Sequence, residues 1–269
     1  MKKILIYITF LISTIFSHSI VNAEEVGTNT IGGVKYSFHY TISNGGSGLQ
    51  PYFLNGPAWV SGFVNGYSIY EILDSVTCTL SSGRTMKKRV LYIESGAFKD
   101  CTSMTSVYIP NSITEIGDSA FYGCTNLLSI TISDNLSSIG KSAFYDCRSL
   151  ATVNFDATNC SMGSADKPVF EGCTSLSNIN IGENVTKIPN YAFAKSGLTS
   201  VTIPSWITNV GNSAFAYCSN LTTINFNSAN CTMGSVPIFE GCSALSNINI
   251  AENVTNIPAY AFAKSGISS

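Results

Sequence analysis

Apolar residues recur at a nearly constant spacing through most of the chain. The marker of the repeat is a phenylalanine that returns every 22 to 26 residues: Phe98, Phe121, Phe144, Phe170, Phe193, Phe215, Phe239 and Phe262. A period in the twenties is typical of a solenoid, in which each repeat buries its apolar face against its neighbours. The spacing therefore predicts a stack of repeats with a ladder of phenylalanines through its core.

Each repeat also contains a short segment in which apolar and polar residues alternate. Alternation with a period of two predicts a half-buried strand. Seven such segments follow one another, with the inward residues Met104-Val107-Ile109, Leu127-Ile130-Ile132, Leu150-Val153-Phe155, Leu176-Ile179-Ile181, Leu198-Val201-Ile203, Leu221-Ile224-Phe226 and Leu245-Ile248-Ile250. Stacked in register, they predict one parallel sheet on the concave side of the solenoid.

The rest of each repeat returns the chain to the start of the next strand. Its clearest form has the apolar pair Ile113 and Ile116, then Gly117, then a turn that buries Ala120 and Phe121. We expect this return to be irregular or to form a short helical turn, which makes the fold a mainly β repeat solenoid. Residues 170–200 and 239–269 agree at 24 of 31 positions, which indicates duplication of a block of several repeats.

Composition limits the function. The chain has 269 residues, of which 38 are Ser, 24 Thr and 24 Asn, and its net charge is -2. Without a basic excess to neutralise phosphates, nucleic-acid binding is not expected. Only His18 and His39 are histidines, so a site with several histidine ligands is excluded and general-base chemistry lacks its usual residue. We therefore predict neither a catalytic site nor a cofactor or metal site.

The first 23 residues have the pattern of a secretory signal peptide. Lys2 and Lys3 precede a mostly apolar run from Ile4 to Phe16, and small residues end the segment at Val21-Asn22-Ala23. The run is shorter than the roughly 20 residues of a membrane-spanning helix. This predicts Sec-type export with cleavage after Ala23, a secreted or cell-surface location, and no membrane insertion afterwards. An N-terminal buried helix is the alternative interpretation.

The repeat resembles a known family. Ile-Gly-Asp-Ser-Ala-Phe-Tyr-Gly-Cys at 116–124, followed by Leu127, Ile130 and Ile132, is similar to the BspA-like leucine-rich repeats of secreted and surface proteins. The resemblance covers about residues 93–269, and more weakly 67–92. It implies a curved solenoid and, where a function is assigned, adhesion to proteins or cells. It implies no catalytic residues.

Cysteines occupy a repeat position as well. Six of the nine lie three residues after a ladder phenylalanine: Cys101, Cys124, Cys147, Cys173, Cys218 and Cys242. Ser196 and Ser265 take the same position in two repeats, which favours a small buried site over an obligate disulfide. Bridges between neighbouring repeats are the alternative. Cys160 and Cys231 lie in two irregular returns that reach Pro168 and Pro237, and these returns are either binding loops or structural variants.

The polar positions of the seven strands predict two outward columns. The first contains Tyr108, Thr131, Asn154, Asn180, Thr202, Asn225 and Asn249, and the second contains Ser106, Ser129, Thr152, Asn178, Ser200, Thr223 and Asn247. A solenoid presents such columns as an extended surface. We predict that the first column binds an extracellular protein or a glycan, whereas an ordinary solvated sheet is the alternative. A surface that binds ice is a further, less favoured hypothesis.

Residues 24–92 break the period and are predicted to cap the first repeat. Trp59, Phe63, Tyr67 and Tyr70 belong either to the core of this cap or to a ligand platform. The chain ends at Ser269 within what resembles another strand, which suggests an uncapped end or a fragment of a longer protein. Two rival functions remain: a structural spacer within a larger surface protein, and a thiol-dependent enzyme that uses His39. The oligomeric state is not predicted.

Overall fold

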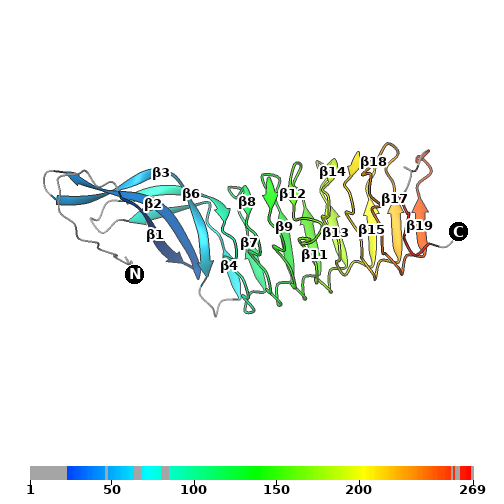
Figure 1. Cartoon of the computed structure of the whole chain (residues 1–269), viewed down its shortest axis with the longest axis horizontal. Helices are drawn as coiled ribbons and strands as arrows, with labels where there is room; N and C mark the ends of the chain where they lie inside the picture. Colours follow the sequence, from blue (N-terminus) through cyan, green and yellow to red (C-terminus); the bar gives the residue numbers. More distant parts are fainter. Residues whose placement is uncertain are drawn as a thin grey trace.

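The structure is a computed structural model that describes residues 23–45, 48–63, 68–79, 85–255, 257 and 261–267. In these ranges it contains nineteen strands and no helix. Strands and turns are stacked along the long axis of an elongated molecule (Figure 1). The solenoid predicted from the repeat is therefore confirmed, and its returns are irregular rather than helical.

The N-terminal region contains a twisted, mostly antiparallel sheet that continues into the solenoid. Its strands are β1 (Ala23–Ile31), β2 (Val34–Gly45), β3 (Gly48–Phe63), β5 (Ser75–Thr79) and β6 (Thr85–Ile93), whereas β4 (Ile69–Glu71) belongs to a separate two-stranded sheet. β3 pairs with β6 in parallel, and β6 pairs with the first return strand. The ring of Phe63 stacks on Phe98 at 6.0 Å, and Tyr70 meets Phe98 edge-on. Phe63 and Tyr70 thus cover the first repeat, while the side chains of Trp59 and Tyr67 lie outside the described residues.

Each repeat contributes one longer strand and one return strand. The longer strands are β7 (Ser106–Tyr108), β9 (Ser129–Ile132), β11 (Thr152–Phe155), β13 (Asn178–Ile181), β15 (Ser200–Ile203), β17 (Thr223–Phe226) and β19 (Asn247–Ile250). The return strands are β8 (Glu115–Ile116), β10 (Ser138–Ile139), β12 (Ser161–Met162), β14 (Lys187–Ile188), β16 (Asn209–Val210) and β18 (Thr232–Met233). Each return strand has only two residues, and turns make up the rest of each return.

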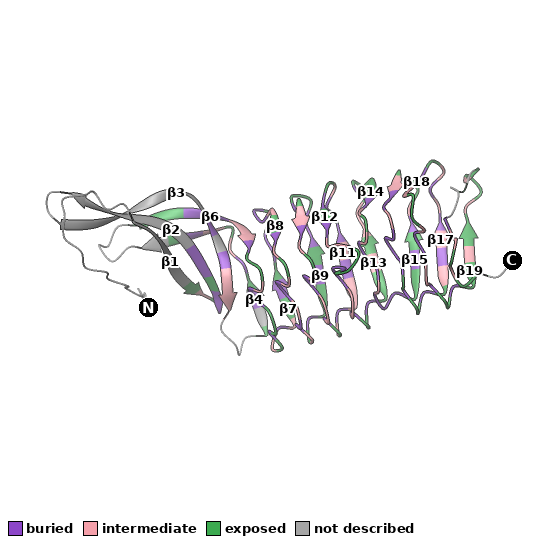
Figure 2. Cartoon of the chain, viewed as in Figure 1, coloured by how far each residue is buried: buried purple, intermediate pink, exposed green. Residues whose placement is uncertain are grey.

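The core lies between the two sets of strands, and Figure 2 shows buried and exposed residues alternating along them. The eight ladder phenylalanines form a continuous stack, with neighbouring ring centroids 4.9 to 5.7 Å apart and ring planes within 15° of parallel. This distance is close to the spacing of about 4.8 Å between paired strands. One ring per repeat therefore fills the core at the pitch that the backbone sets.

The long strands are divided among three sheets, not the single sheet predicted from the alternation. β9, β11 and β13 form one sheet, β15, β17 and β19 form another, and β7 pairs with β4. The residue after each strand explains the interruption between β13 and β15: Asp156 and Asn227 each donate a backbone N–H to the preceding repeat, at 2.9 and 3.0 Å. Pro204 takes this position after β15 and has no N–H to donate.

The return strands are interrupted in the same repeat. Gly140, Gly163 and Gly211 donate backbone N–H groups to the preceding return strand at 2.8 to 3.0 Å. Pro189 occupies this position after β14, and β12 and β14 are not paired. One repeat, with a proline on each side, therefore divides the solenoid into two blocks.

Candidate binding surface

The predicted binding residues lie on one face of the solenoid. We call this surface, formed by the outward side chains of the seven long strands, the strand face. Tyr108, which lies at the N-terminal end of the strand face, is 59% exposed. Thr131, Asn180, Thr202 and Asn249 are exposed, while Asn154 and Asn225 are partly buried. The structure thus brings all seven candidate residues to the surface in one line.

Side chains of this line are hydrogen-bonded to one another. Asn154 donates its Nδ2 to Thr131 Oγ1 at 3.2 Å, and Asn180 donates to Asn154 Oδ1 at 2.7 Å. A second chain repeats the arrangement, because Asn225 donates to Thr202 at 3.1 Å and Asn249 donates to Asn225 at 2.8 Å. Each partner lies in the neighbouring repeat, so the bonds run along the axis of the solenoid.

These bonds fix side chains that would otherwise rotate freely. Immobilising a flexible side chain on binding costs free energy, and a group that is already ordered avoids part of this cost. The same bonds use hydrogen-bonding capacity that a ligand would otherwise satisfy. The strand face is therefore an ordered polar surface, with Tyr108 as the only aromatic residue of the line.

An acidic hollow adjoins the strand face at the C-terminal ends of its strands. Thr131, Ser133, Asp134, Asp156 and Glu183 line it together with Asn111, Gly182 and Asn184. Ser133 is 7% exposed, and its hydroxyl has no hydrogen-bond partner among the described residues. The hollow supplies oxygen acceptors beside the column and extends the polar surface around its edge.

The cysteines are part of the core. All eight described thiols are free and buried, and those of five ladder cysteines donate to the carbonyl oxygen of the phenylalanine in the preceding repeat, at 3.1 to 3.2 Å. Burial raises the pKa of Cys160 and Cys242 to about 12. A nucleophilic cysteine needs a lowered pKa, so this environment opposes thiolate chemistry. The side chains of Cys78 and His39 lie outside the described residues.

Sequence reasoning overlooked a second surface, on the return strands. A hollow of about 560 Å³ extends from Tyr92 to Gly163, and one of about 710 Å³ extends from Thr158 to Gly211. The sequence signal for it is the glycine that follows most return strands, as in Ile116-Gly117 and Ile139-Gly140, because these glycines line the first hollow between two rows of side chains.

The described residues contain no group of three or more His, Cys, Asp or Glu side chains arranged to hold a metal ion. The same part of the chain, which consists of strands and turns, includes no helix with the length and apolar character needed to cross a membrane.

Fold and repeat together define a solenoid of the leucine-rich-repeat class. Residues 77–166 and 161–268 match the BspA type leucine-rich repeat region, in six copies. The chain therefore belongs to the family of BspA-type leucine-rich-repeat proteins. The family assignment made from the motif is confirmed.

Solved structures that are similar to this chain come from several bacteria. The leucine-rich repeat protein of T. pallidum is 26% identical, with a TM-score of 0.53 over 71% of this chain and 83% of its own. A leucine-rich repeat protein of Bacteroides ovatus is 19% identical, with a TM-score of 0.38 over 87% of this chain and 79% of its own. A leucine-rich cell surface protein of Faecalibacterium prausnitzii is 20% identical, with a TM-score of 0.38 over 88% of this chain and 80% of its own. No curated protein matches the sequence.

Proposed function

We propose that the protein is a secreted or cell-surface binding module of the adhesion type, which recognises an extracellular protein or glycan through the strand face. The observation that carries the proposal is the line of outward polar side chains on successive strands, ordered by hydrogen bonds between repeats. The predicted signal peptide and the family support an extracellular role. No catalytic step and no cofactor belong to the proposal.

The composition of the strand face suggests weak binding at each contact. Energetically dominant interface residues are usually Trp, Tyr or Arg. Tyr108 is the only such residue in the line, so we expect modest affinity from a single molecule. Display of many copies on a surface would strengthen attachment through avidity.

The test is binding of the purified protein to an array of extracellular proteins and glycans, at two salt concentrations because screening separates nonspecific ionic contacts from specific ones. The variant carries Thr131→Lys, Asn154→Lys, Asn180→Lys and Asn225→Lys. We expect saturable, salt-tolerant binding that this variant loses. Unchanged binding by the variant would refute the assignment to the strand face, and no binding to any array member would favour a structural spacer.

A further inference from the structure

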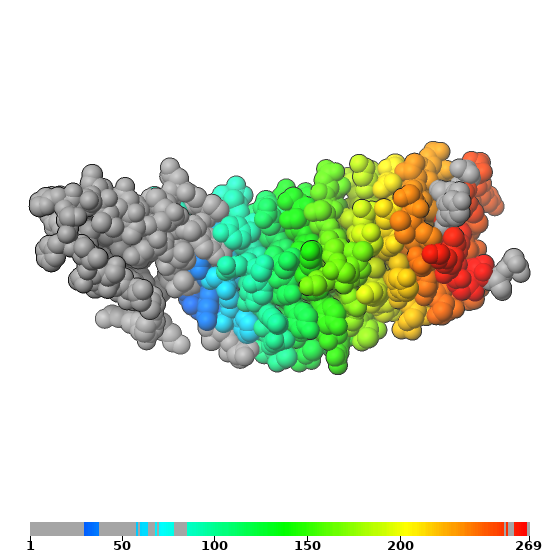
Figure 3. All heavy atoms as spheres, in the orientation of Figure 1, coloured from blue at the N-terminus to red at the C-terminus, as the bar shows by residue number. Residues whose placement is uncertain are grey.

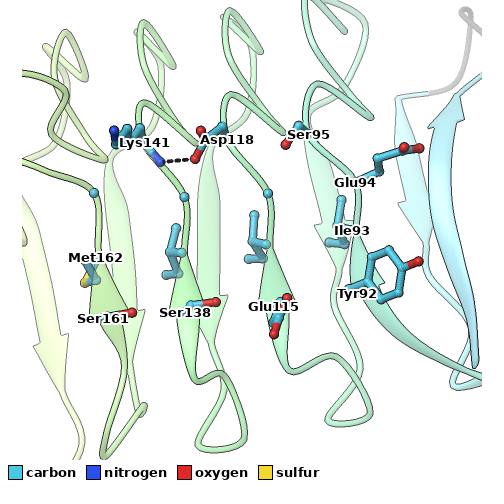
Figure 4. Close-up of a pocket in the computed structure, with 15 residues that line it drawn as sticks. Tyr92, Ile93, Glu94, Ser95, Glu115, Asp118, Ser138, Lys141, Ser161 and Met162 are labelled. Carbon is cyan, nitrogen blue, oxygen red and sulfur yellow. Dashed lines mark hydrogen bonds between the residues drawn. The ribbon is translucent and has the colours of Figure 1, made fainter.

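We infer that the return strands form a second binding site, a groove that takes a neutral, linear oligosaccharide lying along the axis of the solenoid. This inference shares the proposed binding role but assigns it to a different face, with its own residues. Figure 4 shows the part of the groove between Tyr92 and Met162.

Glycines form the floor of this return groove. Gly117, Gly140 and Gly163 follow β8, β10 and β12 in successive repeats. A Cβ atom on Gly140 would collide with the backbone of Asp118, and one on Gly117 would collide with the backbone of Ser95. Close packing of neighbouring repeats therefore requires glycine here, and these glycines contribute only backbone atoms to the floor.

Two rows of polar side chains form the banks. One row contains Tyr92, Glu115, Ser138 and Ser161, and the other contains Ser95, Asp118 and Lys141 (Figure 4). Asp118 Oδ1 accepts the backbone N–H of Lys141 at 2.7 Å, which fixes its carboxylate at the rim. The banks are therefore ordered by the repeat, as the strand face is.

The groove continues past the interruption at Pro189. The two hollows share Ser161, Met162 and Gly163, and the second one adds Asp166, Lys187, Tyr191 and Asn209. Since Tyr92 and Asn209 lie five repeats apart, the groove is about 24 Å long at the usual strand spacing. The space-filling view shows the repeats as one continuous elongated surface (Figure 3).

The spacing of the banks favours a saccharide over a peptide. An extended peptide advances about 3.3 Å per residue, so side chains on one face recur about every 6.7 Å and fall out of step with repeats about 4.8 Å apart. A hexose in an extended chain advances by close to one repeat. Successive sugar units would therefore meet equivalent positions on successive repeats.

The chemistry of the lining also fits hydroxyl groups. Four carboxylates line the two hollows, Glu94, Glu115, Asp118 and Asp166, against the two lysines Lys141 and Lys187. Hydrogen bonds from neutral donors to carboxylates are stronger than those between neutral groups, whereas a polyanion would be repelled. Tyr92 and Tyr191 add aromatic surface near the two ends, for the C–H faces of sugar rings.

The experiment is calorimetric titration of the purified protein with neutral β-1,4-linked oligomers of glucose and of N-acetylglucosamine, from the trimer to the hexamer. We expect saturable binding of at least one series, with affinity that rises with chain length. An acidic hexasaccharide and an unstructured basic peptide of twelve residues serve as comparison ligands, and neither is expected to bind in the groove.

Two variants test the groove. Ser138→Arg with Ser161→Arg places bulk on one bank. Glu115→Gln with Asp118→Asn removes charge, while the new amide oxygen of the second substitution can still accept the backbone N–H of Lys141. Each variant should weaken binding of the neutral hexamer at least tenfold with an unchanged melting temperature, and the fourfold lysine variant of the strand face should stay within twofold of wild type.

Three results would overturn the inference: no binding of any neutral oligomer, loss of binding only in the strand-face variant, or binding of the peptide or acidic sugar that the groove variants abolish. Failure here leaves the proposed function intact, because that proposal depends on the strand-face variant alone.

Discussion

The two blocks of the solenoid have the same strand arrangement and are joined by a repeat that breaks it. β9, β11 and β13 pair in register in the first block, as β15, β17 and β19 do in the second. Between the blocks, Pro189 and Pro204 replace residues whose N–H groups would join the sheets. The pairing of strands stops there on both faces.

The side-chain core does not stop there. Phe170 and Phe193 stack across the junction at 5.6 Å and 10°, a geometry like that within the blocks. Two systems connect the repeats, the pairing of strands and the phenylalanine ladder. At the junction the ladder stays regular while the strands are not paired, and backbone hydrogen bonds still cross it, from Gly172 N–H to Lys195 O at 3.4 Å and from Gly197 N–H to Cys173 O at 3.1 Å. Changes to the ladder and to the backbone should therefore have different consequences at the junction and within a block.

The largest effect is expected from Phe193→Ala. Truncating a fully buried phenylalanine costs about 3 to 5 kcal/mol. At the junction it also removes a ring contact where the strands are not paired, so we expect two unfolding transitions in chemical denaturation. Phe144→Ala, within the first block, is the matched control and should lower stability without such separation. One cooperative transition in both variants would show that the junction is no weaker than the blocks.

A smaller effect is expected from Asn227→Pro, which places a proline after β17 at the position that Pro204 occupies after β15. Asn227→Pro removes the N–H that bonds to Ile203 O at 3.0 Å. Leaving a buried acceptor unpaired costs about 1 to 3 kcal/mol. Denaturant titration should show this loss, and hydrogen exchange should show faster opening of β15 and β17.

The reverse change, Pro204→Asn, should stabilise by about 1 kcal/mol at most. The new hydrogen bond to Ile181 is offset by the greater freedom of the unfolded chain without proline. If Asn227→Pro were neutral, the missing donor could not be the reason that the sheets separate at Pro204.

The sequence predicts the fold more completely than it predicts the binding surfaces. Regular spacing from Phe98 to Phe262 predicts the stack, since a 22–26-residue period has few structural solutions. The interruption at Pro189 and Pro204 was not predicted, although both prolines are visible, because their effect depends on the register between neighbouring repeats. The hydrogen bonds from Asn154 and Asn225 depend on rotamers, which alternation alone does not determine. The return groove depends on the distance between two rows of side chains in the stacked repeats, which the positions of the glycines alone do not determine.

A moderate, pH-dependent effect is expected from the buried thiols. Burial raises the pKa of Cys218 to about 11 and that of Cys242 to about 12 in the folded protein. A raised pKa means that the unfolded state loses its protons first. The buried, protonated thiols therefore make their whole contribution to stability below about pH 8.5, the usual thiol pKa. This contribution falls as the pH rises towards 12.

Cys218→Ser separates this effect from general alkaline unfolding. Serine does not titrate in this range, and Ser196 already occupies the equivalent position in the junction repeat. The variant should lose less stability than wild type between pH 8 and pH 11, measured by denaturant titration under reducing conditions. Identical slopes against pH would mean that Cys218 does not titrate on unfolding.

The smallest effect concerns the asparagine chains of the strand face. Asn154 and Asn180 are bonded at 2.7 Å within the first block, whereas the described structure shows no hydrogen bond between Asn180 and Thr202 across the junction. A net hydrogen bond contributes about 0.5 to 1.5 kcal/mol, and these exposed ones belong at the lower end. A double-mutant cycle of Asn154→Ala and Asn180→Ala should therefore give a coupling of about 0.5 kcal/mol.

The matched cycle of Asn180→Ala and Thr202→Ala should give a coupling within about 0.3 kcal/mol of zero, the usual limit of additivity for groups that do not interact. Equal coupling in the two cycles would mean that the polar chain crosses the junction although the backbone pairing does not. A coupling near zero between Asn180 and Thr202 would mean that the strand face consists of two short ordered segments. A ligand that bridges them would need contacts on both sides of Pro204.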